Sequence, residues 1–453
     1  MMDMDIQMID TGKVNAVEKY PNVISLSAYR LMRVKDESLL ADALRNTSRA
    51  AVFTIRINGY QMLLQTFAGC SGDQIACQVE KLLLVSLRET DFAVHVSPDE
   101  FVVLITDIAE TTDVEEVAVR IIRACSYLES HEAQRIPVSI DIGISNFPAD
   151  ARGAGELLRF AHIALHTLDA TRHGNFQVFS QELRTRHCEG MTMTGELIQA
   201  MQDNRIELMY QPIYSMSTDF IVGVEALVRL RTTDGELILP DEFIDVAERS
   251  GLIVPLGEWI VQQACSQLAQ WQEAGATSLR MSINVSPVQL EDPGFCGVLE
   301  NAVRIAGINF ADVEIEIIER QQVDASIDAV LSRLRQLGVK VAVDDFGTGY
   351  SSLANLARYP LDAVKIDQSF IRAMLDNVVA KSIVSAIFAI ATELNLKVIA
   401  EGVETRAQEN FLRELGCLTA QGFGYARPLS ATVLSHLFSA TSGNVCRHSI
   451  RTL

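Results

Sequence analysis

The sequence lacks an apolar run long enough to cross a bilayer. Its longest such run, residues 383–392, is far shorter than the roughly 20 residues that a membrane-spanning helix needs, and it predicts a buried helix instead. The first residues, MMDMDIQMID, contain acids rather than the basic flank of a signal peptide. We therefore expect a soluble, cytoplasmic protein with no membrane span.

Paired cysteines and an excess of positive charge are also missing. The eight cysteines are scattered without a CxxC spacing, which predicts reduced thiols that mostly lie in the core. The net charge of −20 repels nucleic acid and anionic membranes unless cations intervene, so we expect no nucleic-acid partner. An acidic protein that acts on a phosphate substrate is expected to recruit metal, although a solubilising surface explains the acidity equally well.

Changes of pattern along the chain predict its domains. A chain of 453 residues is long enough for about two or three domains. Residues 1–49 predict a helical or flexible lead, 50–180 an α+β domain, 181–194 a polar linker, 195–440 a barrel domain and 441–453 a C-terminal tail.

In the first large segment, strand-like runs alternate with amphipathic stretches. The strand candidates are 51–57, 92–96, 101–106 and 137–145, and the helix candidates are 74–87 and 114–130. The second and third strands meet at the short turn SPDE, which predicts a β-hairpin. Helices on a mixed, largely antiparallel sheet make an α+β domain.

The second large segment has a strand–helix rhythm that predicts a (βα)8-type TIM barrel and hence an α/β fold. The expected strands are 206–214, 221–230, 279–286, 313–319, 339–346, 363–370, 397–404 and 419–426. A clear helix lies at 327–337, where apolar residues recur at spacings of three and four. The connection 215–220 is too short for a crossover helix, so the first strand is expected to be antiparallel to the second.

Polar side chains gather in and at the ends of these strands, where barrel enzymes place their chemistry. From the second strand to the eighth they are Glu225, Asn284, Glu316, Glu319, Asp344, Asp345, Lys365, Asp367, Glu401, Glu404 and Gln421. Unpaired buried carboxylates are costly, so their convergence calls for cations. Oxygen ligands without His or Cys suit Mg²⁺ or Mn²⁺ better than Zn²⁺. Any one of these acids alone is more often a capping or surface residue.

The adjacent pair Asp344 and Asp345 suits two ions, because one carboxylate can bridge both while its neighbour binds the second. Two ions about 3.5–4 Å apart activate a water and hold the phosphate oxygens during in-line displacement. Lys365 either orients that water or forms a structural salt bridge with the acids. The next segment, FGTGYSSL (346–353), predicts a mobile loop over the site or a simple tight turn.

These residues lie in longer motifs that closely resemble those of the EAL family of cyclic-di-GMP phosphodiesterases. The naming motif Glu-Ala-Leu stands at 225–227. The other matching motifs are YQPI (210–213), SINVSP (282–287), DDFGTGYSSL (344–353), KIDQSF (365–370), AEGVE (400–404) and QGFGYARPL (421–429). They occur in the family's order over residues 191–438, which makes the resemblance specific.

The resemblance implies hydrolysis of cyclic-di-GMP to linear pGpG with two Mg²⁺ or Mn²⁺ ions, in a homodimer formed through the barrel. The residues implied to form the metal site are Glu225, Asn284, Glu316, Asp344, Asp345 and Glu401. The residues implied in catalysis are Glu225, Lys365, Asp367, Glu319 and Gln421. Within that set, Lys365 and Asp367 are implied to position the attacking water, and Glu319 to hold the 346–353 loop. The residues implied to contact substrate are Gln211, Arg229 and Glu404, with Arg229 on a phosphate.

One departure from the family lies on the fourth strand. The chain reads Glu316-Ile317-Ile318-Glu319, where the family usually has Glu-Ile/Val-Thr-Glu. Loss of the threonine hydroxyl is expected to loosen the hydrogen bonding under the loop. Both glutamates are kept, so we expect altered tuning rather than inactivity.

The first large segment resembles, less closely, a GGDEF domain, the cyclase fold that makes the same dinucleotide. Its signature here is SPDEF (97–101), in which proline adds bulk and removes an N–H where glycines allow close approach to nucleotide. Arg56 stands where the family has a metal-binding aspartate, and Leu64 and Asp169 replace an asparagine that reads guanine and a lysine that binds phosphate. Of the family's functional residues Asp73 and Glu100 remain, which is too little, so we predict no cyclase activity.

The same segment keeps one other family pattern. Arg88 and Asp91 match the RxxD inhibitory site, where arginine holds phosphate or guanine and aspartate accepts guanine N–H groups. The pattern predicts an effector site for cyclic-di-GMP. The alternative is a solvated pair on a surface turn.

The leading hypothesis is an active phosphodiesterase whose first domain is regulatory or structural. The alternative is a cyclic-di-GMP receptor that binds without turnover and signals through a protein partner, and a third reading is a scaffold. An intact ligand set favours the enzyme, because a receptor needs neither metal ligands nor Lys365.

Overall fold

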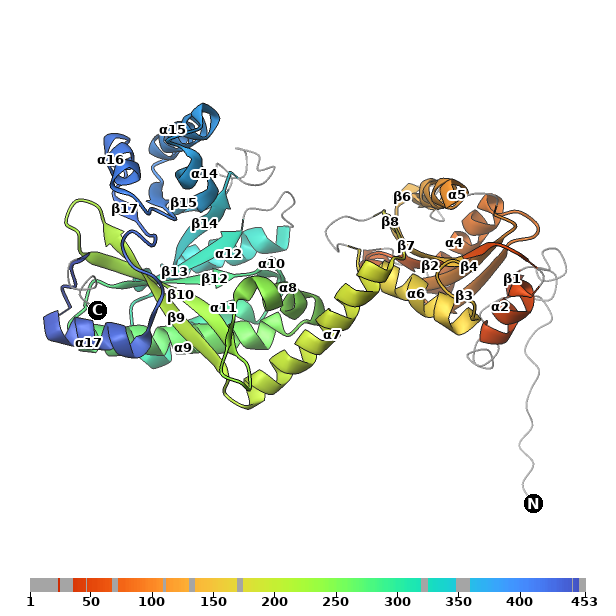
Figure 1. Ribbon diagram of the computed structural model, residues 1–453, viewed down its shortest axis with the longest axis horizontal. Coiled ribbons are helices and arrows are strands. Elements are labelled where there is room, and N and C mark those ends of the chain that lie inside the picture. The colour runs from red at the N-terminus through yellow and green to blue at the C-terminus, as the bar shows by residue number, and fades with distance from the viewer. Residues whose placement is uncertain are drawn as a thin grey trace, which may run out of the picture. The chain divides into compact units, whose positions relative to one another are not determined.

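Two compact units make up the chain, Met1–Met191 and Thr192–Leu453, and each is described by itself (Figure 1). The computed structural model describes residues 23–24, 36–45, 47–66, 72–108, 111–129, 135–168, 174–318, 325–347, 359–441 and 443–447. Over those residues, no helix has both the length and the apolar character needed to cross a membrane.

The first unit is built on a six-stranded mixed sheet in the order β1-β3-β4-β2-β7-β8. Its strands are β1 (Val23–Ile24), β3 (Phe92–Ser97), β4 (Glu100–Thr106), β2 (Ala50–Ile57), β7 (Ile140–Phe147) and β8 (Phe176–Val178). Strands β3 and β4 form the predicted hairpin, and β2 pairs antiparallel with both β4 and β7. The arrangement confirms the predicted α+β domain.

Helices cover both faces of this sheet. They are α2 (Asp36–Leu44), α3 (Tyr60–Thr66), α4 (Gly72–Ser86), α5 (Thr111–Ala124) and α6 (Ala154–His166). Figure 1 shows α4 and α5 on one face and α6 on the other, which explains why β2 is buried along almost its whole length. Helix α6 crosses so closely that a Cβ on Gly143 would lie 2.0 Å from the Ala161 carbonyl oxygen, so only glycine fits there.

One helix prediction in this unit was wrong in extent. The helix expected at 114–130 ends at Ala124, because Tyr127–Glu129 forms β5 and pairs with β6 (Arg135–Pro137). The segment expected as a linker, 181–194, is helical and belongs to α7 (Gln181–Gln202).

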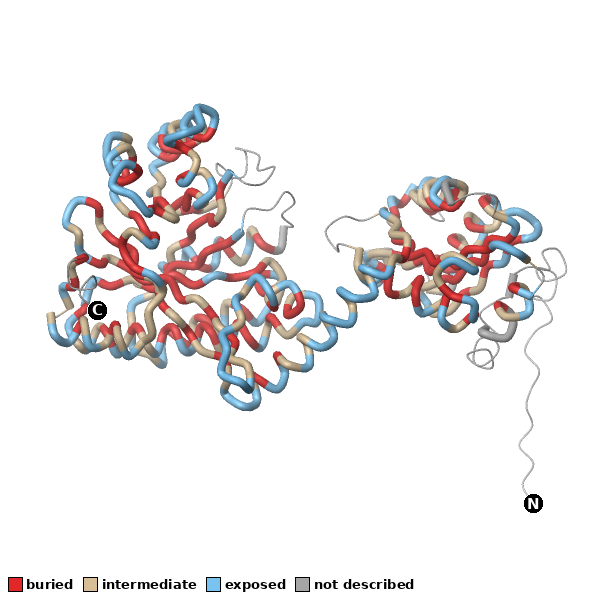
Figure 2. Tube along the Cα trace, in the orientation of Figure 1, coloured by how far each residue is buried: buried red, intermediate tan, exposed pale blue. Residues whose placement is uncertain are grey.

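The second unit is a closed eight-stranded barrel, as predicted. Its strands in spatial order are β9 (Ile206–Ser215), β10 (Ile221–Arg231), β12 (Arg280–Val285), β13 (Val313–Ile318), β14 (Lys340–Phe346), β15 (Ala363–Ile366), β16 (Lys397–Ala400) and β17 (Thr419–Ala420). The barrel closes because β9 pairs antiparallel with both β10 and β17, whereas the other neighbours are parallel. The antiparallel first strand is confirmed. Figure 2 shows the buried residues concentrated along these strands.

Helices follow most of the barrel strands. They are α8 (Pro240–Ser250), α9 (Ile253–Glu273), α10 (Pro287–Glu291), α11 (Phe295–Ala306), α12 (Ala325–Leu337), α14 (Gln368–Ala373), α15 (Val378–Glu393), α16 (Arg406–Glu414) and α17 (Ala431–Thr441). Two short strands, β11 (Leu237–Ile238) and β18 (Leu429–Ser430), flank the barrel sheet.

The last predicted strands are shorter than expected. Strand β15 ends at Ile366, because Asp367 caps α14 by accepting a hydrogen bond from the Ser369 backbone N–H at 3.0 Å. Strand β16 ends at Ala400 and β17 at Ala420. Functional candidates predicted on strands therefore lie just beyond them, in loops that can carry chemistry.

The apolar run 383–392 is one face of a surface helix rather than a fully buried helix. Within α15, Val384, Ile387 and Phe388 are buried, but Ala386 and Ala389 are exposed. The alanines on the outer side lengthened the run without adding to the core.

Candidate functional site

Four carboxylates converge on one ammonium group inside the barrel. The distances from Lys365 Nζ are 2.6 Å to Glu316 Oε2, 2.8 Å to Glu401 Oε1, 3.1 Å to Asp344 Oδ2 and 3.4 Å to Glu225 Oε2. Lys365 is fully buried. With all five groups ionised, one positive charge faces four negative ones, and burying uncompensated charge is costly unless another cation is present.

Strand register places these groups. Parallel pairing sets Asn284 on β12 opposite Glu316 on β13. Because alternate side chains of a strand share a face, Glu314 and Glu316 point the same way, and Glu314 accepts a hydrogen bond from the Ser282 hydroxyl at 3.0 Å. Two residues further along β12, Asn284 Nδ2 donates to Glu225 Oε1 at 2.7 Å, so side-chain hydrogen bonds link β12 to both of its neighbours.

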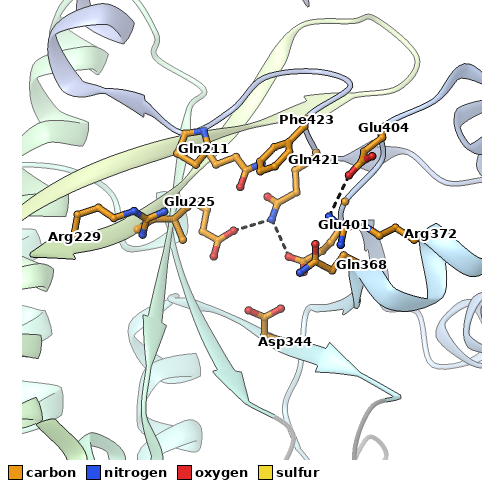
Figure 3. A pocket seen from close by; sticks show the side chains of 14 residues that line it. Gln211, Glu225, Arg229, Asp344, Gln368, Arg372, Glu401, Glu404, Gln421 and Phe423 are labelled. Carbon is orange, nitrogen blue, oxygen red and sulfur yellow. Dashed lines mark hydrogen bonds and ion pairs between the residues drawn. The ribbon is translucent and has the colours of Figure 1, made fainter. Parts of the chain in front are cut away.

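The amide of Gln421 links two of the carboxylates. Its Nε2 donates to Glu225 Oε2 at 2.7 Å and to Glu401 Oε1 at 2.8 Å (Figure 3). Gln421 Oε1 and Glu316 Oε1 are buried and have no hydrogen-bond partner within the described part of the chain. Buried acceptors of this kind are normally satisfied, so both oxygens suit a bound cation or its water.

Burial and crowding shift the pKa values of the cluster apart. Burial, together with repulsion from Asp344 and Glu225, raises the pKa of Glu401 to about 8 despite the attraction of Lys365. Burial likewise raises the pKa of Glu316. Burial also acts to raise the pKa of Glu225, but Lys365 and the hydrogen bonds from its neighbours outweigh it and the pKa falls. Perturbed groups clustered in a cleft are typical of a functional site.

Asp345 adds a second acidic centre. It has a φ of +52°, a left-handed conformation that is uncommon for residues other than glycine and is often found at functional sites. Burial, followed by the charges of Asp344 and Asp367, raises its pKa to about 6.

The described acids form two groups that can each hold a cation. One group is Glu225, Glu316 and Asp344, and the other is Asp344, Asp345 and Glu401. In each group, one oxygen per residue lies within 4.8 Å of the others. Asp344 belongs to both groups, and carboxylate oxygens are the ligands that hard divalent cations prefer.

A cavity of about 250 Å³ opens over this cluster. Its lining residues include Gln211, Glu225, Arg229, Asp344, Gln368, Arg372, Glu401, Glu404, Gln421 and Phe423. In Figure 3, Arg229 and Arg372 lie at opposite edges of the view with the carboxylates between them. Arg372 Nη2 is held 3.1 Å from Glu404 Oε1. The cavity therefore combines an acidic floor with a guanidinium on either side.

Three polar or aromatic side chains of the cavity wall were missed by sequence reasoning. Gln368 and Arg372 lie one helical turn apart on α14, where a strand was expected, so their common direction could not be seen. Phe423 is half-exposed and belongs to the motif QGFGYARPL (421–429), and the Arg427 guanidinium lies 4.4 Å from the centre of its ring. The spacing of four residues between Gln368 and Arg372 was the signal that could have placed both on one face of a helix.

Some predicted site residues lie outside the described residues. They are Glu319, Asp169 and most of the 346–353 loop. The structure brings the predicted metal-site residues of the barrel together with Lys365 and Gln421, and it places Gln211, Arg229 and Glu404 on the cavity wall.

In the first unit, the predicted effector pair is not arranged as two free side chains. Both Asp91 oxygens accept backbone N–H groups, from Arg88 at 2.8 Å and from Thr106 at 3.2 Å. Asp91 is buried and the Arg88 side chain is exposed. This geometry favours a role for Asp91 in shaping the turn.

At the position where the GGDEF family has a metal-binding aspartate, this chain has a cationic side chain, Arg56. Arg56 Nη2 lies 3.8 Å from Asp141 Oδ2, and Glu100 Oε1 lies 3.1 Å from His162 Nδ1. Asp141 and Glu100 therefore each have a side-chain partner.

Comparisons with known proteins agree with the two-unit organisation. The EAL domain family model matches residues 194–428, and the model for the diguanylate cyclase GGDEF domain matches residues 25–175. Cyclic di-GMP phosphodiesterase NbdA of Pseudomonas aeruginosa is 35% identical over 86% of this chain and 50% of its own length. MucR of the same organism, named a bifunctional diguanylate cyclase/cyclic di-GMP phosphodiesterase, is 32% identical over 92% of this chain and 61% of its own.

A solved structure extends the match to the barrel. The chain described as "PaMucR Phosphodiesterase, c-di-GMP complex" is 38% identical with a TM-score of 0.52, and the match covers 54% of this chain and 99% of that one. The present chain spans only 50% and 61% of the length of the two curated relatives. The family match covers more than half of its residues, and the chain belongs to the EAL domain family, with a GGDEF domain preceding the EAL domain.

Proposed function

We propose that the EAL domain hydrolyses cyclic-di-GMP to linear pGpG with the help of two divalent cations, Mg²⁺ or Mn²⁺. The observation that carries the proposal is the presence of two clusters of three acids that have Asp344 in common, with the Lys365 ammonium 3.1 Å from Asp344. The names of NbdA and MucR and the cyclic-di-GMP complex of a 38% identical barrel support the choice of substrate.

Each predicted metal-site residue has a place in this scheme. The residues that would hold the cations are Glu225, Asn284, Glu316, Asp344, Asp345 and Glu401. When bound, the cations supply an activated water and neutralise the phosphate oxygens. Before they bind, Lys365 holds the carboxylates together by offsetting part of their repulsion.

The other residues orient substrate and water. Lys365 lies fully buried among the carboxylates, and its ammonium would donate to the attacking water there. Gln421 fixes the relative position of Glu225 and Glu401 through its amide. Arg229 on the wall offers a fork of donors for a phosphate, a geometry that lysine does not provide.

Three further groups would act around this core. Asp367 neighbours Asp345 at the start of α14 and would help to position the water. Gln211 and Glu404, on the cavity wall, would contact the nucleotide. For Glu319, a role in holding the 346–353 loop is proposed on the sequence motif alone.

A test that separates the enzyme from a receptor starts with binding. The purified chain is equilibrated with cyclic-di-GMP in a chelator, and Mn²⁺ is then added in excess. We expect the released nucleotide to be pGpG by mass spectrometry. Recovery of intact cyclic-di-GMP after tight binding would support the receptor instead.

We also infer that the GGDEF domain makes no cyclic-di-GMP. The support is Arg56, which stands where the family has a metal-binding aspartate and whose guanidinium lies 3.8 Å from Asp141. Because the relative MucR is named bifunctional, the inference needs its own assay. Labelled GTP should not be incorporated into cyclic-di-GMP by a Glu225→Ala variant, in which any product would accumulate.

The barrel is further proposed to form a homodimer. Sedimentation equilibrium at several protein concentrations tests it, because a monomer at every concentration would exclude the dimer.

A further inference from the structure

The C-terminal segment 443–447 lies beyond the matched family region, which ends at 428, yet it returns to the barrel. Its backbone joins the turn between β9 and β10. The Ile221 N–H donates to the Val445 carbonyl and the Arg447 N–H donates to the Asp219 carbonyl, both at 3.0 Å. Val445 is fully buried, so the segment is fixed in place.

The side chain of Arg447 reaches from this segment towards the site. Its Nη2 donates to the Gly424 carbonyl at 2.7 Å and its Nη1 donates to Glu409 Oε2 at 2.9 Å. Its guanidinium lies 4.1 Å from the centre of the Tyr425 ring. The residue is only 4% exposed. A buried arginine held by a carboxylate, a carbonyl and an aromatic face has little freedom to move.

The carbonyl that Arg447 binds belongs to a loop, residues 421–426, that carries part of the cavity wall. Gln421 and Phe423 line the cavity, whereas Gly424 faces the protein. The Gly424 N–H donates to the Val403 carbonyl at 2.9 Å. A Cβ on Gly424 would lie 2.6 Å from the Glu404 carbonyl oxygen, so the loop is pressed against the segment that follows Glu401.

The contacts therefore form a continuous chain. Arg447 fixes Gly424, Gly424 is three residues from Gln421, and the Gln421 amide bridges Glu225 and Glu401. We infer that Arg447 is a positioning residue of the phosphodiesterase site, which holds the 421–426 loop so that Gln421 keeps the two carboxylates in place. The inference rests on the proposed function. Small displacements of positioned groups and loss of their outer supports commonly cost enzymes 10-fold to 100-fold in activity.

Two substitutions of Arg447 test the inference, with Arg413→Met as the matched control. Arg413 Nη2 binds the same Glu409, at 2.8 Å, but within the described residues it makes no hydrogen bond to the 421–426 loop. Arg447→Met removes the fork, whereas Arg447→Lys keeps the positive charge near Glu409 and cannot also hold Gly424 in the same geometry.

Two readouts are measured on each folded variant. The first is kcat and KM for cyclic-di-GMP; we expect kcat to fall about 10-fold to 100-fold in Arg447→Met, less in Arg447→Lys, and not at all in Arg413→Met. The second is amide hydrogen exchange without substrate. We expect faster exchange at Gln421 and Gly424 in the Arg447 variants and no change along β13.

The outcomes separate this inference from the proposed function. If the wild-type chain has no activity, the proposed function fails, and the exchange data still judge whether Arg447 holds the loop. If the wild type is active and Arg447→Lys has the same kcat and the same exchange, the inference is overturned. An equal loss of kcat in Arg413→Met also overturns it, because the effect would then come from Glu409. Should Arg447→Met not fold, Arg447→Lys decides.

Discussion

Replacing Lys365 by methionine should destabilise the barrel chiefly in the absence of metal and at high pH. The substitution keeps most of the side-chain volume but removes the positive charge that four carboxylates contact within 3.4 Å. Removing one partner of a buried ion pair typically costs about 3–5 kcal/mol, because the other charge stays buried without compensation.

Protonation limits this loss. Glu316 and Glu401 already have raised pKa values, and without Lys365 those values rise further. A carboxyl group whose folded pKa lies above its unfolded value stabilises the fold at low pH and loses that contribution as the pH rises through the folded pKa. In a chelator we therefore expect a loss of about 3 kcal/mol at pH 8 and a smaller loss at pH 5. Excess Mn²⁺ should restore part of it by supplying the missing charge.

Urea unfolding followed by tryptophan fluorescence measures the effect. The chain's two tryptophans, Trp259 and Trp271, both lie on α9, so their emission reports the barrel alone. Lys340→Met is the control, because Lys340 forms a partly exposed pair with Asp362 that should be worth less than about 1 kcal/mol. Equal unfolding free energies of Lys365→Met and the wild type at pH 8 in chelator would refute the reasoning.

Three other predictions concern the site. Metal binding should weaken below about pH 8 and again below about pH 6, because Glu401 and Asp345 must lose protons to become ligands. Calorimetric titration with Mn²⁺ from pH 5.5 to 8.5 checks this prediction, and a constant affinity would contradict it. Arg229→Met should raise KM about 10-fold or more, because the variant loses a charged hydrogen bond to phosphate. Steady-state kinetics measure this change, and an unchanged KM would show that Arg229 does not bind substrate. Ile318→Thr restores the hydroxyl that is usual in the family and should raise kcat about 5-fold, which corresponds to the free energy of one hydrogen bond. A kcat equal to that of the wild type would show that position 318 does not tune the rate.

The barrel could be predicted because its repeating pattern is strong. Eight apolar runs, most of them separated by helical patterns, indicated the strands, and the six-residue connection 215–220 correctly indicated an antiparallel first pair. The ends of the strands were harder to predict, because helix capping competes with the hydrogen bonding of the sheet. Asp367 caps a helix at a point where we had expected the strand to continue to Phe370. The error hid Arg372, whose position depends on that helix.

Contacts between distant segments left no pattern in the sequence. Arg447 is 23 residues from its partner Gly424 and 38 from Glu409, and neither spacing marks an interaction within one element. In contrast, the acids around Lys365 could be predicted as a group, because each sits on or just after a strand and parallel strand ends meet at one face of a barrel.

The most direct test of the account is the rate at which the purified chain, with excess Mn²⁺, converts cyclic-di-GMP to pGpG, measured beside Glu225→Ala. Glu225 belongs to the first cation group and accepts hydrogen bonds from both Asn284 and Gln421, so its loss should abolish activity. The account predicts steady pGpG formation by the wild type and none above background by the variant. No product from the folded wild type, or equal rates for the two proteins, would contradict it.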